Sequence, residues 1–301
     1  MIKQPFWRGV IPAITTPFTI AGDVDSDFLA KHASIMVDAG CTGIVPLGSL
    51  GEGNTLSFEE KQEILRVLVR SLGRRVPVIP GIAALSTRDA VRLAKEAESI
   101  GCRGLMVLPP YVYAGDWPEM KAHVSAVISA TQLPCLLYNN PVAYRTDFLP
   151  SQIAELMELH ENLEAVKESS TDVRRITAIL ELLGNRLEIL VGVDDAIVEG
   201  VAAGAVGWIA GLVNAFSHES VTLFELARRG DCNATSQLYR WFLPLLRLDT
   251  VPKFVQLIKL AQERVGLGSE RVRLPRMSLQ GEERARSLAL IEHAIKYRSN
   301  K

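Results

Sequence analysis

The chain has 301 residues and 48% hydrophobic content, which is enough for one large hydrophobic core or two modest ones. Its formal net charge is −1, its pI is near 6.5, and no long run of like charge appears. Charge therefore gives no reason to expect nucleic acid or an anionic membrane as a partner.

The cysteines are widely spaced, with no CxxC pair and no nearby histidine cluster. This spacing indicates small buried hydrophobic side chains rather than a disulfide framework or a structural zinc site, for Cys41, Cys102, Cys135 and Cys232. The N-terminal residues lack the apolar core of a signal peptide, and glycine, proline or charge interrupts every apolar run. We therefore expect a cytoplasmic protein without a transmembrane helix.

Short apolar runs, small-residue turns and amphipathic stretches alternate along the first two-thirds of the chain. The runs are nearly continuous in Val, Ile, Leu and Ala, which favours strands buried on both faces of a parallel sheet. The predicted strands are Gly9–Ile14, Gly43–Leu47, Val76–Gly81, Gly104–Leu108, Pro134–Tyr138, Leu163–Lys167, Leu187–Val191 and Gly207–Ala210.

Recognisable helix starts lie between these runs. Ser57 followed by Glu60 has the capping-box spacing, and further helices are predicted to open at Thr87 and Asp172. Eight strands alternating with helices predict a (β/α)₈ TIM barrel, which typically needs roughly 250 residues. A doubly wound sheet is the rival fold, but its Gly-rich first turn is missing after the first strand.

The strand signal stops near residue 216. The segments after it have apolar stripes typical of helices that pack on a core or on another subunit: Glu219–Arg229, Ala234–Leu248, Pro252–Val265 and Gly281–Tyr297. No Gly/Ser-rich linker precedes them. We therefore expect a barrel over residues 1–215 and a C-terminal helical extension over residues 216–301, packed on it as one domain.

Lys167 ends a predicted strand at the edge where parallel barrels carry their active sites. Burial there disfavours the ammonium and makes a neutral amine available near neutral pH. A neutral amine can attack a ketone and form an imine, which acts as an electron sink. The alternative is a structural lysine that extends its ammonium to the barrel mouth.

Tyr138 ends the preceding predicted strand and should lie beside Lys167. Its phenol could move protons or donate to an oxyanion, or it could be a packing residue with a hydrated hydroxyl. The turn from Gly48 to Glu52 offers consecutive backbone N–H groups through Ser49 and Leu50, a suitable cradle for a carboxylate. A purely structural turn is the alternative, with Glu52 bracing it or facing solvent.

The histidines fall mostly in or beside predicted helices and give no converging set of metal ligands, which disfavours a metal-dependent barrel enzyme. Asp194 and Asp195 could bind a hard cation, but neighbouring aspartates after Gly192 more often cap the next helix. No metal and no cofactor are expected.

Taken together, these motifs resemble the dihydrodipicolinate synthase / N-acetylneuraminate lyase family of class I, Schiff-base aldolases. The resemblance covers nearly the whole chain, and the order and spacing of its motifs are specific. It is carried by segments 9–18, 48–52, 137–141, 166–170 and 192–195.

The resemblance implies that Lys167 forms the imine and that Tyr138 relays protons, with Ser49 keeping a hydroxyl for the relay. The backbone N–H groups of Ser49 and Leu50 would bind the carboxylate of a small 2-oxo acid, and the backbone of Ile209 would line the same pocket. It also implies a homotetramer.

Three positions depart from the biosynthetic synthases of this family. Leu50 stands where they have a second threonine in the turn, and Val112 where they have the tyrosine that acts across subunits. An ungapped alignment places Ala143 where they carry a substrate-binding arginine, with Arg145 two residues later. A lost buried cation would remove a contact worth about a few kcal/mol.

These departures favour a catabolic lyase for a hydroxylated 2-oxo acid or its cyclic imine, similar to 1-pyrroline-4-hydroxy-2-carboxylate deaminase or to keto-deoxy sugar-acid dehydratases. The alternatives are 4-hydroxy-tetrahydrodipicolinate synthase, another pyruvate-dependent aldolase, and, from a different class, a catalytically inactive barrel that binds carboxylates.

Overall fold

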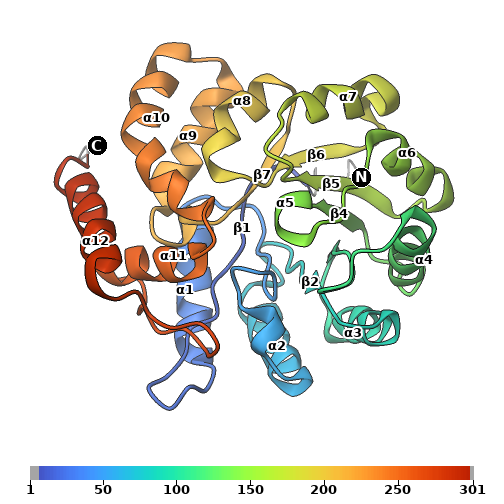
Figure 1. Ribbon diagram of the computed structural model, residues 1–301, viewed down its shortest axis with the longest axis horizontal. Coiled ribbons are helices and arrows are strands. Elements are labelled where there is room, and N and C mark those ends of the chain that lie inside the picture. Colours follow the sequence, from blue (N-terminus) through green and yellow to red (C-terminus); the bar gives the residue numbers. More distant parts are fainter. Residues whose placement is uncertain (1–6, 299–301) are drawn as a thin grey trace.

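The structure, a computed structural model, describes residues 7–298 and is built around a curled parallel sheet surrounded by helices (Figure 1). The strands follow the order β1-β7-β6-β5-β4-β3-β2. Their bounds are Gly9–Pro12 (β1), Gly81–Ile82 (β2), Leu105–Val107 (β3), Cys135–Asn139 (β4), Leu163–Glu168 (β5), Glu188–Val191 (β6) and Gly207–Ala210 (β7).

Residues 43–47 fill the place between β1 and β2 and close the barrel. Ala13 pairs with Val45 and Ile44 pairs with Val78, both in parallel. This segment thus takes the eighth strand position of the barrel, although it forms isolated bridges rather than a regular strand. Pro46 and Pro77 lie in or beside these pairings, and proline has no N–H to donate to a ladder. The predicted (β/α)₈ barrel is confirmed.

The helices that accompany the strands form the outer layer. They are Ser26–Asp38 (α1), Phe58–Leu72 (α2), Thr87–Ile100 (α3), Trp117–Ile128 (α4), Pro141–Tyr144 (α5), Pro150–Leu159 (α6), Arg174–Leu183 (α7), Ile197–Ala202 (α8) and Ser217–Arg229 (α9). The predicted capping box of α2 is present, since Ser57 Oγ accepts from the Glu60 amide and the Glu60 carboxylate accepts from the Ser57 amide. The helix predicted to open at Thr87 does so, with Ser86 as its N-cap.

Three further helices follow α9: Cys232–Leu246 (α10), Phe254–Arg264 (α11) and Gly281–Lys296 (α12). The short 3₁₀ helix Arg247–Asp249 (η5) leads from α10 towards α11, and α11 contacts the 3₁₀ helix Leu212–Asn214 (η4) that follows β7. We name residues 265–280, which connect α11 to α12, the C-terminal strap. Helix α11 therefore lies beside the segment that follows β7, and the strap reaches Phe18 and Glu52.

The strands carry the core. All five residues of β4 are buried, as are five of the six residues of β5, in agreement with the near-continuous apolar runs of the sequence. Three of the cysteines are buried as predicted, but Cys232 is exposed, because it occupies the first position of α10. Among residues 7–298, no helix is both long and apolar enough to cross a membrane.

Candidate active site

Lys167 is the penultimate residue of β5, and it pairs with Tyr138 of the neighbouring strand β4. Its side chain is buried, and its nitrogen lies 4.2 Å from the centre of the Tyr138 ring. Burial lowers the pKa of Lys167 to about 8, although the negative charges of Asp249 and Asp194 oppose the shift. The amine therefore has a substantial neutral fraction near neutral pH.

The Tyr138 hydroxyl faces the same side of the barrel mouth. It accepts a hydrogen bond of 3.0 Å from the Asn140 amide nitrogen. Burial raises the pKa of Tyr138 to about 12, so the phenol keeps its proton until a reacting group takes it. The structure confirms the prediction that Lys167 and Tyr138 lie side by side.

The turn from Gly48 to Glu52 directly follows segment 43–47, at the carboxyl end of that barrel segment. Leu50 is buried and Ser49 is half-buried. Within the part of the chain that the structure describes, the backbone N–H groups of Ser49 and Leu50 donate to no other protein group. The turn is tight, because a Cβ at Gly53 would lie 2.0 Å from the Leu47 carbonyl oxygen. Two free amides in a rigid turn are suited to a carboxylate.

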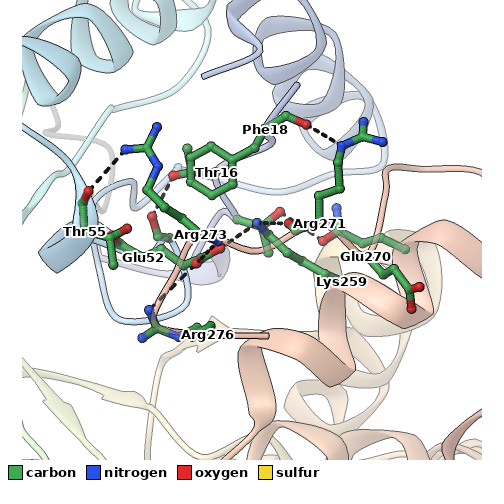
Figure 2. A network of polar contacts seen from close by, with 12 residues as sticks. Thr16, Phe18, Glu52, Thr55, Lys259, Glu270, Arg271, Arg273 and Arg276 are labelled. Atoms are coloured by element: carbon green, nitrogen blue, oxygen red, sulfur yellow. Dashed lines mark hydrogen bonds and ion pairs between the residues drawn. The ribbon is translucent and has the colours of Figure 1, made fainter. Parts of the chain in front are cut away.

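Glu52 braces this turn from below by a buried ion pair (Figure 2). Its carboxylate lies 2.6 Å from the Lys259 nitrogen of α11 and accepts a hydrogen bond of 3.0 Å from the backbone of Arg273. Both side chains of the ion pair are almost fully buried. The turn-bracing alternative for Glu52 is thus the one the geometry supports.

The C-terminal strap completes this network (Figure 2). Arg273 donates to the Thr55 carbonyl and forms a salt bridge with Glu60, while Arg271 donates to the Phe18 carbonyl. Thr16 donates to the Gly51 carbonyl at 2.6 Å from the other side. The turn that carries Ser49 and Leu50 is therefore held by residues from both ends of the chain.

Tyr144 is a site residue that the sequence analysis missed. It lies at the end of α5, which Asn140 caps by accepting from the Ala143 amide. The Tyr144 and Ser49 hydroxyls form a short hydrogen bond, and the Tyr144 ring packs edge-to-face on Tyr138 with centroids 5.6 Å apart. An Asn-Pro pair typically opens a helical turn, so this motif could have indicated that the chain folds back over the strand end.

Of the three positions that depart from the family pattern, Leu50 is buried and the other two are exposed. Ala143 and Arg145 both face solvent, as does Val112, which has a φ of 73°. The neighbouring Tyr113 hydroxyl donates to Glu119 rather than into the barrel. Ile209, the predicted lining residue, is buried in the middle of β7.

Asp194 does not cap the helix that follows it, so that prediction was wrong. Its carboxylate instead accepts hydrogen bonds from the Trp208 indole and from the backbone N–H groups of Gly211 and Leu212. These donors saturate the carboxylate and fix the turn after β7. Among residues 7–298, no three His, Cys, Asp or Glu side chains are grouped so that they could hold a metal ion.

Asp249 was also missed, because it belongs to η5 in the C-terminal extension. Its carboxyl lies against the end of β7, where a Cβ at Gly211 would be 2.1 Å from Asp249 Oδ1. Burial and the charge of Asp194 raise the pKa of Asp249 well above its usual range, and Lys167 opposes this shift. A carboxyl from the helical extension therefore faces the same region as Lys167.

A separate cavity of about 590 Å³ lies between Tyr111, Asn54 and the C-terminal strap. The Asn54 amide donates to the Tyr111 hydroxyl at its wall. Lys167, Tyr138 and Ser49 do not line this cavity, so we place the reacting groups outside it.

Comparison with known proteins gives the family. The family model of the dihydrodipicolinate synthetase family matches residues 6–294. A relative from Geotalea daltonii, named 4-hydroxy-tetrahydrodipicolinate synthase, is 32% identical over 273 residues, covering 89% of this chain and 92% of the relative.

Solved structures agree. A dihydrodipicolinate synthase from Aquifex aeolicus is 27% identical with a TM-score of 0.91, covering 95% of this chain and 98% of that one. A prophage protein of E. coli K12 from the dihydrodipicolinic acid synthase family, solved in complex with pyruvate, is 26% identical with a TM-score of 0.90, covering 97% and 99%.

The fold and these likenesses define a TIM-barrel lyase of the class I, lysine Schiff-base type. The chain belongs to the dihydrodipicolinate synthetase family.

Proposed function

We propose that this protein forms an imine between Lys167 and a small 2-oxo acid and uses the imine as an electron sink for bond cleavage at C4. The observation that carries the proposal is the buried Lys167 amine, with a pKa of about 8, next to the Tyr138 phenol. An amine with this pKa is partly neutral near neutral pH, and the neutral form is the nucleophile that imine formation needs.

Each contact of the site has a role in this chemistry. The free N–H groups of Ser49 and Leu50 bind the carboxylate of the 2-oxo acid, and the backbone at Ile209 lines the opposite side. Lys167 attacks C2, and the resulting carbinolamine loses water with a proton from Tyr138. Tyr138 then takes a proton from C3, which gives the enamine and restores the phenol.

Tyr144 supplies a further hydroxyl to the relay from the same chain. Its hydrogen bond to Ser49 and its ring contact with Tyr138 connect the two residues that the family resemblance places in proton transfer. Val112 cannot supply a hydroxyl, so an in-chain tyrosine takes over the part that a second tyrosine plays in the biosynthetic synthases. This arrangement makes proton transfer independent of a neighbouring subunit's side chain.

For the second half of the reaction, we propose elimination from a hydroxylated 2-oxo acid or its cyclic imine. Three features support it: the apolar Leu50 in the turn, the exposed Arg145 and Ala143, and the carboxyl of Asp249 near Lys167. An aldehyde substrate with its own carboxylate would need a cation at the site, whereas Arg145, the arginine next to the aligned position, faces solvent.

Condensation of pyruvate with an aldehyde is the second candidate. The names of the relatives support it, since proteins 28–32% identical to this chain are called 4-hydroxy-tetrahydrodipicolinate synthase. A homotetramer, as the resemblance implies, also stays a prediction, and sedimentation of the purified protein measures it.

Substrate turnover separates the two candidates. The purified protein is assayed with pyruvate plus aspartate semialdehyde, and separately with 1-pyrroline-4-hydroxy-2-carboxylate, with the Lys167→Ala variant as control in both. We expect turnover of the hydroxylated pyrroline. Faster condensation of pyruvate with the semialdehyde would instead establish the synthase reaction.

A further inference from the structure

The side chains around Lys167 include two polar groups that the imine chemistry above does not use. One is the Asp249 carboxyl, against Gly211 at the end of β7. The other is the Ser169 hydroxyl, which follows β5 directly. Both come from residues that the family resemblance did not assign.

Tyr138 and Asp249 reach Lys167 from different elements of the fold. In the sheet, β4 with Tyr138 is the neighbour of β5 on one side, whereas β7 lies two strands away on the other. The Asp249 carboxyl contacts the end of β7, where only glycine leaves room for it at position 211. A substrate bound to Lys167 therefore has both a phenol and a carboxyl in its surroundings.

The Asp249 carboxyl is free to act on a ligand. Within residues 7–298 its side chain takes part in no hydrogen bond, in contrast to Asp194, whose oxygens are saturated by backbone and indole donors. The charged groups that face it are Lys167, Asp194 and Asp195. Burial and the two neighbouring aspartates favour its protonated form.

Ser169 gives independent support for a polar ligand at this place. It is 2% exposed and its Oγ forms no regular hydrogen bond with a described residue, although it lies close enough to the Tyr138 hydroxyl to lower the pKa of that phenol. A Cβ at Gly192 would lie 2.0 Å from Ser169 Oγ and 2.5 Å from Lys167 Cε, so the hydroxyl and the lysine side chain both pack against this glycine. A buried hydroxyl that lies between Lys167 and Tyr138 and forms no regular hydrogen bond is available to a polar ligand bound there.

We propose that Asp249 is the general acid that protonates the leaving group of the Lys167-bound substrate, and that this substrate carries a hydroxyl group on C4. The inference rests on the proposed imine at Lys167 and extends it to a substrate class: 4-hydroxy-2-oxo acids and their cyclic imines.

The step balances without any oxidant or reductant. In the enamine, the nitrogen lone pair re-forms the C2=N bond, and the C2=C3 electron pair becomes the C3=C4 bond. The C4–O bond breaks with its electron pair on oxygen, and the proton of Asp249 converts the leaving hydroxide to water. Solvent returns a proton to the carboxylate. A neutral carboxylic acid is the form that this step needs, and burial provides it.

Comparing pyruvate trapping with turnover in one variant distinguishes a general acid from a residue that acts only on the charge of Lys167. The Asp249→Asn variant replaces a largely protonated acid by a neutral amide and removes whatever carboxylate charge raises the pKa of Lys167. Its amine is then more often neutral, and borohydride trapping of pyruvate at pH 7 should be as fast as in the parent protein, or faster. If Asp249 acts only through Lys167, turnover should follow trapping.

The test measures both quantities in the full-length protein with 1-pyrroline-4-hydroxy-2-carboxylate as the probe. Asp195→Asn is the matched control, since it makes the same chemical change in a nearby carboxylate that pairs with Arg247. We expect Asp249→Asn to trap pyruvate fully but to lose about 10²- to 10⁴-fold in turnover, the usual share of acid–base catalysis, together with the alkaline limb of the pH profile. Asp195→Asn should stay within about twofold of the parent.

Three outcomes would overturn the inference: unchanged turnover in Asp249→Asn, loss of pyruvate trapping in that variant, or a parent protein that traps pyruvate but does not turn over the C4-hydroxylated probe. Failure of the proposed imine chemistry itself looks different, because the parent protein would then trap no pyruvate.

Discussion

The Lys167 nitrogen lies 4.2 Å from the centre of the Tyr138 ring, and the two residues are partners across adjacent parallel strands. The contact joins a nucleophile and a proton carrier on the most rigid part of the barrel. Their relative position is set by the β4–β5 register rather than by a loop, so substitution of either side chain should leave the other in place.

The first prediction concerns pH. The pKa of Lys167 is lowered to about 8. As the pH increases towards 8, the neutral fraction of the amine therefore rises about tenfold per pH unit, and above pH 8 it levels off. The rate of borohydride trapping of pyruvate should follow this curve. A rate that keeps rising towards pH 10, as for an ordinary lysine, would contradict the burial of the amine.

Tyr138→Phe should keep imine formation and lose about 10²- to 10⁴-fold in turnover, because the ring stays but the proton carrier is removed. Trapping and turnover are measured on the same preparation. Full activity in this variant would remove Tyr138 from the mechanism.

Tyr144→Phe and Ser49→Ala remove the two ends of one hydrogen bond. Each should reduce turnover by about 10²-fold, the lower end of acid–base effects, and the double variant should be little slower than either single one. A double-mutant cycle of kcat/KM tests this. Additive losses would show that the two hydroxyls act separately.

The buried ion pair between Glu52 and Lys259 should stabilise the fold more than it serves the chemistry. Lys259→Met removes the nearer cation of the buried Glu52 carboxylate and leaves only Arg276, at 3.7 Å, which should cost up to about 3–5 kcal/mol of unfolding free energy. Urea unfolding measures this loss. The double variant Glu52→Gln/Lys259→Met should recover part of it, because no buried charge is then unpaired.

Much of the fold could be predicted from the sequence because burial on both faces leaves a local signature. The apolar runs ending at Tyr138 and Lys167 gave the strands, and the parallel order put both residues at one edge. The bridged segment 43–47 was harder to define, since its prolines weaken the ladder without changing its apolar character.

The residues that escaped sequence analysis reach the site through tertiary packing. Asp249 and Lys259 lie in a helical extension whose apolar stripes predict helices but not the surface they pack on. Tyr144 depends on a four-residue helix that turns the chain back over its own strand. Asp194 was assigned to the nearest helix, whereas the free backbone donors after β7 were the better partners.

The central claim is that Lys167 is the imine-forming residue, and adduct mapping tests it most directly. Burial lowers the pKa of Lys259 to about 8 as well, so pKa alone does not distinguish the two lysines. Lys259 is held by Glu52 and by the Arg271 carbonyl, whereas Lys167 faces the Tyr138 hydroxyl side of the barrel mouth. The protein is incubated with pyruvate, reduced with borohydride and mapped by mass spectrometry. The account predicts one reduced adduct, on Lys167, that disappears in Lys167→Ala; an adduct on Lys259, or none at all, would contradict it.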